Sequence, residues 1–413
     1  MSPTELPIRP GVPEDWDAIS RLLFTAFNDT FDDELNAVER GIYEPERALL
    51  VIDGEEVVGN AAAFTRDLTV PGAVVPAAHV TMVAVAPTHR RRGLLRRLMH
   101  RQLHEVRDAG REPIAVLWAS EGRIYQRFGY GMATARVSFE IDAREVRLSD
   151  PVAASAPVRL RGADPATART ELSKVYEQLR ADRPGWSSRD ERWWEYVLSD
   201  VPSRRQGATE RRAILHEGQS GVDGYALWRA KGGWESGGPE GQVLAGEVVA
   251  TNPTAYVNLW RFLLSVDLTR SARFWFGTTD EPLLWLANEP RRLGARLGDG
   301  LWVRIVDLPA ALSARRYAAP VDVVIEVADG ILAGNAGTWR LRADASGAGE
   351  CTRTDAPAEL ACDVSVLGAA YLGGTSIGAL AVAGRVRELR PGAVAAASAA
   401  FGWHRAPSGI EIF

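Results

Sequence analysis

Cysteine is nearly absent from this sequence of 413 residues, which contains only Cys351 and Cys362. Two thiols cannot form a framework of disulfides, so the chain has to be stabilised by packed cores, and a reducing, cytoplasmic environment is the simpler expectation. Neither cysteine is paired with a histidine, and a reactive thiol needs an electropositive site, so both are predicted to be structural.

Long apolar runs are missing as well. No stretch approaches the roughly 18 consecutive apolar residues that a membrane-spanning helix needs. The first residues, MSPTELPIRPG, contain no apolar segment of the kind found in a signal peptide. The sequence therefore predicts neither a membrane span nor a secretory leader.

A strong excess of one charge is also missing, since the formal net charge is −5. This balance argues against a nucleic-acid binder. The one basic cluster, Arg90 to Arg92, has no aromatic residues between its arginines, and single-stranded nucleic acids are usually held by such aromatics. No nucleic-acid partner is expected.

A metal site is not predicted either. His100 and His104 are four residues apart on a predicted helix, but no HExxH motif or cysteine partner accompanies them. They are interpreted as solvated helix residues. Three acidic residues further along, Asp280, Glu281 and Glu289, are expected to be surface charges.

The length of the chain predicts two to three domains. Residues 1–150 alternate strand and helix patterns and end in a linker at 142–157 that is rich in Asp, Ser, Pro and Ala. Residues 151–306 repeat this order, so that strands 136–141 and 302–306 are expected to complete the first and second units. Residues 307–413 combine strands with alanine-rich helices, which indicates a small α+β domain.

The stretch from Thr81 to Leu98 is the most informative part of the first domain. A strand at 82–86 leads through the basic loop 88–93 into a helix that begins at Leu94. A strand, a turn and a helix N-terminus direct several backbone N–H groups at one point, and the helix dipole adds positive charge there. Together with the arginines, this predicts a phosphate site. On local sequence alone, a solvated basic turn is an equal alternative.

The second domain lacks such a turn. After the strand at 248–250 come Thr251, Asn252 and Pro253, which are typical of a capped helix start. This domain is therefore predicted not to bind the same ligand.

Four segments resemble the Eis family of GNAT N-acetyltransferases over nearly the whole chain: VAVAPTHRRRGLLR (83–96), ASEGRIYQRFGYG (119–131), RPGWSSRDERWWEY (183–196) and LWVRIVDLPAALSARRY (301–317). The resemblance implies an α/β and α+β chain: two tandem GNAT-like domains, the second degenerate, followed by a domain like the sterol carrier proteins. The sequence departs from the family pattern at Leu95, where a small residue is usual.

The resemblance also implies a reaction and the residues that bind the co-substrate. Acetyl-CoA would donate an acetyl group to a primary amine by direct transfer through a tetrahedral intermediate, with no metal. The binding residues would be Val83, Val85, Arg90, Arg91, Arg92, Gly93, Leu94, Leu95, Arg96, Ser120 and Glu121.

Two catalytic residues follow from the same resemblance. Tyr125 would be the general acid, and the carboxylate of the C-terminal Phe413 would be the general base. Without the resemblance, Tyr125 reads more simply as a core aromatic, and Tyr130 is an equal rival. The ending Ile410 to Phe413 is apolar and strand-like, which suggests that it docks into a cleft, although it could also pad the third domain.

The acceptor is less well defined. Asp29, in the acidic stretch NDTFDDE, is the candidate for holding a cationic amine such as an aminoglycoside, a polyamine or a lysine side chain. Aminoglycoside-modifying relatives carry an acidic residue before the terminus, where this chain has Ile412 and places Glu411 one position earlier. In a strand that shift would reverse the face. The family implies a homohexamer, and the rival hypothesis is a lipid- or sterol-binding carrier on an inactive GNAT scaffold.

Overall fold

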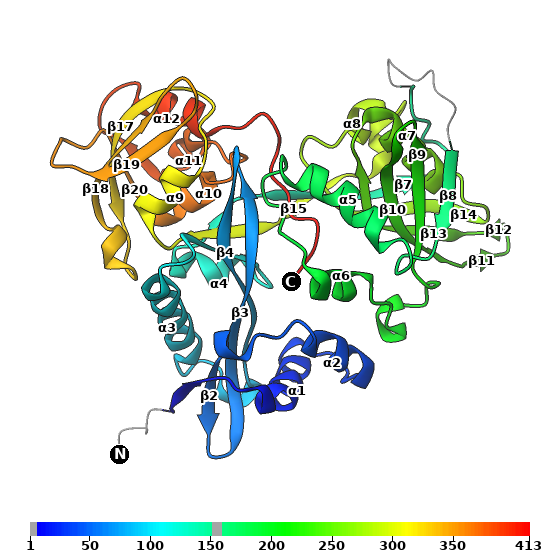
Figure 1. Ribbon diagram of the computed structural model, residues 1–413, viewed down its shortest axis with the longest axis horizontal. Helices are drawn as coiled ribbons and strands as arrows, with labels where there is room; N and C mark the ends of the chain where they lie inside the picture. Colours follow the sequence, from blue (N-terminus) through cyan, green and yellow to red (C-terminus); the bar gives the residue numbers. More distant parts are fainter. Residues whose placement is uncertain (1–5, 151–158) are drawn as a thin grey trace. The chain divides into compact units, whose positions relative to one another are not determined.

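The computed structural model describes residues 6–150 and 159–413, which divide into two compact units. Unit 1 contains residues up to Thr134, Leu301–His404 and Ile412–Phe413, and unit 2 contains Ala135–Gly300 and Arg405–Glu411 (Figure 1). No helix in these ranges is long and apolar enough to cross a membrane. Much of the predicted linker lies outside the described residues.

The first sheet of unit 1 has seven strands, in the order β1 (Ile8–Pro10), β2 (Leu49–Asp53), β3 (Glu56–Val70), β4 (Ala73–Val85), β5 (Ile114–Trp118), β16 (Leu301–Ile305) and β6 (Gly131–Met132). The helices around it are α1 (Trp16–Phe27), α2 (Asp33–Arg40), α3 (Leu94–Ala109) and the short α4 (Gly122–Tyr125). Strand β5 is buried along Ile114 to Leu117, as its continuous apolar run predicts.

Alternating side chains on β2 pack against two different helices. Leu50 packs in a cluster with Trp16 of α1, whereas Leu49 and Val51 pack with Leu98 of α3. Neighbouring residues of a strand point to opposite faces, so α1 and α3 cover opposite sides of the sheet. Figure 1 shows the long β3–β4 hairpin between these helices.

Unit 2 is built on a second seven-stranded sheet, in the order β15 (Arg296–Asp299), β7 (Ala135–Asp142), β14 (Thr269–Gly277), β13 (Gly241–Ala250), β10 (Gly221–Lys231), β9 (Arg212–Gly218) and β8 (Arg159–Ala163). Its helices are α5 (Arg169–Arg180), α6 (Glu191–Leu198), α7 (Pro253–Leu264) and α8 (Leu283–Leu286), and a small ribbon joins β11 (Trp234–Glu235) to β12 (Gly238–Pro239).

One strand of each sheet belongs, by sequence, to the other domain. Strand β7 forms where the sequence predicts it but pairs with β14 and β15 rather than completing the first sheet. Strand β16 pairs with β5 and β6 of the first sheet rather than closing the second. The predicted membership of both strands was therefore wrong. Local hydrophobic patterning identifies a strand but contains no information about its partner.

The third domain begins with α9 (Leu308–Ala314) and has a sheet in the order β19 (Gly349–Arg353), β18 (Gly337–Ala343), β17 (Val321–Ala328), β20 (Leu360–Asp363) and β21 (Val386–Glu388). Helices α10 (Val364–Ala370), α11 (Ile377–Val382) and α12 (Ala393–Phe401) complete it. Burial raises the pKa of the Cys351 and Cys362 thiols to about 12, which fits their predicted structural role.

Helix α10 packs directly onto the first sheet. A Cβ atom on Gly131 would lie 2.0 Å from the Ser365 carbonyl oxygen, and one on Gly368 would lie 2.3 Å from the Val303 carbonyl oxygen. Glycine is needed at both positions because backbone meets backbone there. The third domain thus shares a hydrophobic core with the first.

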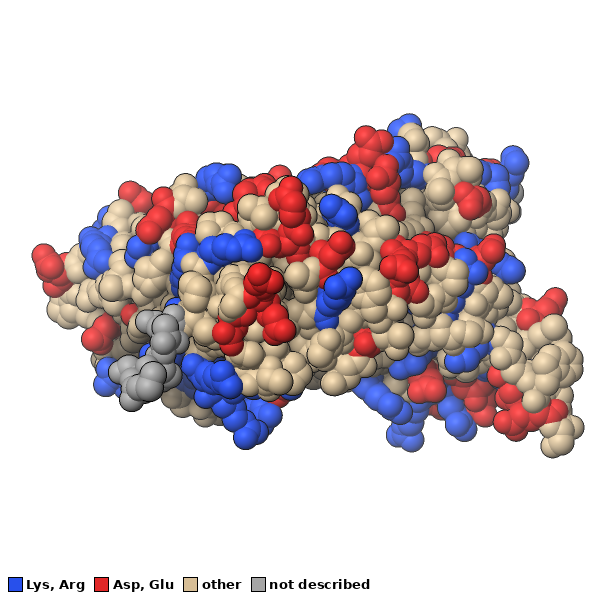
Figure 2. All heavy atoms as spheres, turned by 90° about the horizontal axis from the view of Figure 1, so that it is seen from below, with Lys and Arg blue, Asp and Glu red and all other residues tan. Residues whose placement is uncertain are grey.

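Figure 2 shows one face of the protein, on which acidic and basic side chains are interspersed rather than gathered in a single basic stripe. This mixed distribution agrees with the net charge of −5. It does not resemble the electrostatic footprint expected for nucleic-acid binding.

Candidate active site

The first sheet opens between β4 and β5. Their parallel ladder ends at the pair His79 and Val116, although β4 continues to Val85. On its other side, β4 remains paired with β3 as far as Val85. The backbone of β4 beyond His79 therefore presents an edge outside the β5 ladder, where a ligand could pair with it.

A bulge in β4 accompanies this opening. Asn60 and Ala62 of β3 are two positions apart, but their partners Ala84 and Thr81 are three positions apart. The bulge therefore contains Met82, which has a left-handed φ of 52°. The buried Asn60 amide donates a 2.7 Å hydrogen bond to the Met82 carbonyl and fixes the bulge. Sequence reasoning missed Asn60, although a single polar residue within an apolar strand was a signal.

The predicted phosphate loop ends at the N-terminus of α3. Gly93 is the N-cap residue, with a φ of 79° and no side-chain cap on the first turn. A Cβ at Gly93 would meet nothing within 4 Å, so the space above it is open and its backbone conformation explains the glycine. Arg91 also has a positive φ, 63°, and Arg90 to Arg92 are all exposed. This arrangement suits an anion.

Two contacts hold the loop in place. The buried His89 donates from Nε2 to Asp53 Oδ2 at 3.0 Å, and its Nδ1 lies 2.8 Å from Thr88 Oγ1. Arg90 donates from Nη2 to the Ala26 carbonyl at 3.1 Å, at the end of α1. No role was predicted for His89, which anchors the loop to the end of β2.

The flanking residues differ in what they can offer a ligand. Leu94 is buried in the core, so it can contribute only its backbone N–H, and Leu95 is half-buried. Arg96 is exposed, as are Ser120 and Glu121 after β5. In sequence, these residues lie at the start of α3 or directly after β5.

Tyr125 lies on α4, after β5, and is buried. Burial raises the pKa of its phenol to about 12, while a hydrogen bond with Ser120 acts in the opposite direction. Its ring centroid is 5.9 Å from that of Tyr130. Tyr130 is fully buried and its hydroxyl has no partner among the described residues, whereas Tyr125 contacts an exposed residue of the predicted site.

The C-terminal residue belongs to the same unit as Tyr125. The Phe413 ring packs 4.7 Å from the ring of the buried His79, centroid to centroid. His79 is the last β4 residue that pairs with β5, so the terminus lies where the two strands part. His79 was missed from the sequence, although it interrupts an apolar strand.

The residues just before the terminus are anchored in unit 2. Glu411 forms a 2.6 Å ion pair with the buried Arg189, which also pairs with Glu247 at 2.7 Å and lies over the Tyr176 ring at 4.1 Å. The segment from Ile410 to the end is irregular, so the strand-based argument about the face of Glu411 was wrong. The ion pair with Arg189 instead gives Glu411 a structural role within unit 2.

The tryptophan-rich segment that begins at Arg183 also binds the tail, defined as Arg405–Glu411. Trp186 donates from Nε1 to Ser408 Oγ at 3.2 Å, and the Ser408 N–H donates to the Pro184 carbonyl at 2.9 Å. Gly185 has a φ of 95°, and a Cβ there would lie 2.3 Å from the Ser408 carbonyl oxygen. This segment thus has a specific structural task, which the sequence alone did not indicate.

Asp29 lies in the exposed turn between α1 and α2. Its Oδ1 accepts a 2.8 Å hydrogen bond from the Thr30 N–H, and its side chain remains exposed. Two aromatic residues nearby in sequence, Phe27 and Phe31, are 53% and 40% exposed. An acidic residue between exposed aromatics could receive a cation with an apolar part.

The two histidines of α3 are half-buried rather than solvated, so the expectation of two solvated residues was wrong. His104 Nδ1 lies 2.7 Å from the His100 carbonyl oxygen, a contact within the helix. Over residues 6–150 and 159–413, no three side chains of the metal-binding types come together.

The corresponding helix start in the second domain is closed to anions. Asn252 Oδ1 accepts from the Ala255 N–H at 2.9 Å, and its Nδ2 donates to Asp223 Oδ2 at 2.8 Å. Pro253 has no N–H to offer. The predicted capped helix start is confirmed, and the nearby Asp223 carboxylate opposes a bound phosphate.

Comparisons with known proteins agree with this architecture. Models described as "Acetyltransferase (GNAT) domain" match residues 7–133 and 185–305, and a "Sterol carrier protein domain" model matches residues 308–408. An uncharacterized N-acetyltransferase from Streptomyces avermitilis is 44% identical over 396 residues, covering 95% of this chain and 96% of the relative.

The N-acetyltransferase Eis of Mycobacterium tuberculosis is 36% identical over 399 residues, covering 94% of this chain and 92% of the relative. Among solved structures, Eis1 from Mycobacterium abscessus superimposes with a TM-score of 0.83 at 31% identity, covering 98% of this chain and 100% of that one. These relatives are acetyltransferases matched along nearly the whole chain, so the carrier hypothesis is not favoured.

Proposed function

Since this chain belongs to the Eis family of GNAT N-acetyltransferases, we propose that it transfers an acetyl group from acetyl-CoA to a primary amine, with Tyr125 and the Phe413 carboxylate as its catalytic groups. One observation carries the proposal: the C-terminal ring packs against His79, the residue at which β4 parts from β5. The terminal carboxylate thereby belongs to the same opening of the sheet that the co-substrate would enter.

The residues around this opening fit acetyl-CoA. The β4 edge at Val83 and Val85 offers backbone groups to an extended arm, and one of its N–H groups is suited to a developing oxyanion. The uncapped start of α3 and the exposed Arg90 to Arg92 suit a pyrophosphate. When bound, acetyl-CoA supplies the activated acetyl thioester.

The Phe413 carboxylate is the proposed proton acceptor for the amine. A free α-carboxyl has a pKa of about 3.5, and partial burial favours its neutral form and so strengthens it as a base. The ring of the same residue packs on His79 within unit 1, which supports a place for the carboxylate beside this opening.

Tyr125 is the proposed general acid, which assists the departing sulfur through its O–H group. Its pKa of about 12 keeps the phenol protonated at neutral pH. Because a thiol has a pKa of about 8.5, full transfer to a free thiolate would be unfavourable. The phenol therefore acts by donating its hydrogen bond as negative charge develops on sulfur.

For the acceptor, Asp29 with the exposed Phe27 and Phe31 favours an amine that is cationic before reaction. Aminoglycosides, polyamines and lysine-like amines share this chemistry. A panel of such amines, followed by release of the free thiol from acetyl-CoA, would identify the class. A homohexamer stays a prediction from the family.

The role of the terminus can be tested with two variants that separate the ring from the carboxylate. Adding one glycine after Phe413 keeps the ring and moves the carboxylate, and we expect kcat to fall about 100-fold or more. Phe413→Ala keeps a terminal carboxylate and should retain more activity than the extended chain. Full activity of the extended enzyme, with folding confirmed by circular dichroism, would refute the carboxylate base.

A further inference from the structure

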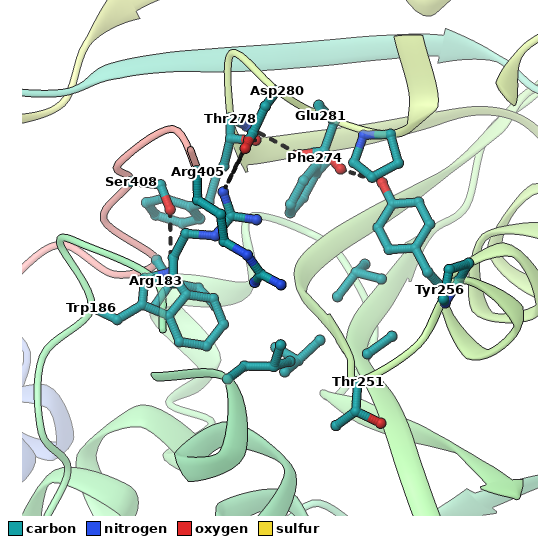
Figure 3. Close-up of a pocket in the computed structure, with 18 of the residues that line it drawn as sticks. Arg183, Trp186, Thr251, Tyr256, Phe274, Thr278, Asp280, Glu281, Arg405 and Ser408 are labelled. Carbon is teal, nitrogen blue, oxygen red and sulfur yellow. Dashed lines mark hydrogen bonds and ion pairs between the residues drawn. The ribbon is translucent and has the colours of Figure 1, made fainter. Parts of the chain in front are cut away.

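A second pocket of about 560 Å³ lies wholly within unit 2, among residues of the second GNAT-like domain and the tail segment Arg405–Glu411. Its volume falls in the range of pockets that take drug-sized ligands, about 300–1,000 Å³. Figure 3 shows the side chains of Arg183, Trp186, Tyr256 and Phe274 around this space. None of these residues is among those proposed to bind acetyl-CoA or to catalyse the transfer.

The pocket has the same structural origin as the opening in the first domain. The parallel ladder of β13 with β14 ends at Ala245 and Phe274, although β13 continues to Ala250. The adjacent residues Leu227 and Trp228 of β10 face Glu247 and Ala245, so β13 also carries one extra residue, Gly246. The parted strands leave the space that the pocket occupies.

The start of α7 is not a phosphate site of the kind seen at α3. It is capped by the Asn252 side chain, begins with Pro253 and adjoins the Asp223 carboxylate. A pyrophosphate would therefore not be held there as it would be at the uncapped helix start after Gly93.

The walls of the pocket are mainly apolar and aromatic. Trp186, Phe274 and Ile410 are buried lining residues, and Trp285 contributes an indole that is 84% exposed. A largely exposed tryptophan is unusual for a side chain that gains so much from burial. Such walls suit a flat or aliphatic ligand body that would cover the indole.

Two arginines give the pocket its polar character. Arg183 uses only Nη1 for its hydrogen bonds to Asp280 and to the Ala406 carbonyl, and its Nε and Nη2 have no partner among the described residues. Arg405 pairs through Nε with Asp182 at 3.1 Å, and the side chains of this pair are 35% and 52% exposed. In Figure 3 both guanidinium groups extend into the pocket.

The carboxylates of the pocket are already occupied. Asp280 accepts from Arg183 and from the Ala406 N–H, and Glu281 is bonded to the Tyr256 hydroxyl and the Thr278 N–H. Burial raises the pKa of Glu281, while its hydrogen bonds with Tyr256 and Thr278 act in the opposite direction. The expectation that Glu281 is a surface charge was wrong, because it is 5% exposed. The unsatisfied groups in the pocket are donors on cations, not acceptors.

From the cavity, its aromatic walls and the free guanidinium edges, we infer that this pocket binds a small apolar or aromatic carboxylate. The planar carboxylate would accept paired hydrogen bonds from Arg183 and Arg405, which is the geometry that guanidinium groups favour. The ligand body would lie along Trp186 and Phe274 and cover Trp285.

The test is calorimetric titration of the full-length protein with indole-3-acetate and decanoate, in saturating CoA so that the first-domain opening is filled. We expect dissociation constants below about 1 mM, and binding of indole-3-acetamide about 10-fold weaker or more, because the amide cannot accept two charge-assisted hydrogen bonds. Equal binding of acid and amide, or no binding of either acid, would overturn the inference.

Three variants locate the ligand. Arg405→Gln should weaken the acids about 10-fold without affecting the amide, and Thr251→Trp, at an exposed lining position, should block both by filling the mouth. Trp285→Ala removes an exposed side chain and should weaken both slightly. Arg291→Gln, an exposed arginine outside the pocket, is the control and should change nothing. If neither Arg405→Gln nor Thr251→Trp changed the dissociation constants, the ligand would bind outside this pocket. That conclusion would hold whether or not acetyl transfer occurs as proposed.

Discussion

The two GNAT-like domains of this chain open their sheets in the same way and differ in what the opening can hold. In each, a one-residue bulge lies in the strand whose parallel ladder ends early, β4 at His79 and β13 at Ala245. In the first domain the following helix begins at Gly93 with an uncapped turn and three exposed arginines. In the second domain the following helix has Asn252 as its N-cap, and the Asn252 side chain accepts a hydrogen bond from the Ala255 N–H.

The comparison shows that the opening and its chemistry are separable. Bulge and strand divergence follow from topology and survive in both domains, whereas anion binding depends on a few loop residues. Those residues differ in the second domain, where the space has aromatic walls and two arginines instead. Two domains with the same sheet opening can in this way present pockets of different chemistry.

Substitution of Tyr125 gives the strongest test of this difference between the two domains. Tyr125→Phe should lower kcat about 100-fold with little change in acetyl-CoA binding, because only the donated hydrogen bond is lost. Tyr130→Phe, in the same core, and Tyr256→Phe, on α7 of the second domain, should leave kcat within about 3-fold, since neither hydroxyl is proposed to contact the reacting atoms. Unchanged turnover in Tyr125→Phe would exclude its role as proton donor.

The pH dependence of the rate probes the same phenol. With a pKa of about 12, Tyr125 keeps its proton across the usual assay range, so kcat should show no alkaline decline up to about pH 10. The same pKa shift affects the free energy of unfolding at alkaline pH. Above about pH 10 the phenol ionises in the unfolded chain before it ionises in the folded one, so the stability of the fold should fall between about pH 10 and 12. A decline in kcat centred near pH 8, with the fold intact, would contradict this.

The phosphate loop should give the next largest effect. Replacing Arg90, Arg91 and Arg92 together by glutamine should raise the KM for acetyl-CoA about 10- to 100-fold, since each exposed charge-assisted contact is worth about 0.5–1 kcal/mol. The effect should shrink at high salt, which already screens these contacts. Arg291 and Arg292, exposed arginines of the second domain, are the matched control, and their replacement by glutamine should leave this KM unchanged.

Much of this site could be predicted from sequence because its signals are local. The loop at 88–93, the helix start at Leu94 and the cap at Asn252 depend on residues next to each other in the chain, and the structure has them where they were expected. Tyr125 and Phe413 came from the family resemblance. Their catalytic roles stay predictions.

The features that were missed depend on contacts between distant residues. No local pattern shows that Asn60 fixes the bulge at Met82, that Arg189 holds Glu411, or that β7 pairs within the second sheet. Glu281 looked like a surface charge because its burial depends on Tyr256, 25 positions away. Polar residues within apolar strands or beside tryptophans were the available signals.

Gly93 should show a smaller effect. Gly93→Ala places a side chain at a φ of 79° in open space, so the cost is backbone strain of about 1–2 kcal/mol, together with a Cβ at the predicted phosphate position. We expect a 3- to 10-fold higher KM for acetyl-CoA, corresponding to roughly 1 kcal/mol. Gly54→Ala has a φ of 61°, also in open space, and should show similar destabilisation without the change in KM.

The smallest effect is expected at the start of α7. Asn252→Ala removes the cap on Ala255 and the bond to Asp223, which should destabilise unit 2 by about 1 kcal/mol in thermal melting. The KM for acetyl-CoA should not change, because this helix start is already closed to anions by its cap, its proline and Asp223. A raised KM would mean that the second domain takes part in co-substrate binding, and the contrast between the two helix starts would no longer explain which domain binds acetyl-CoA.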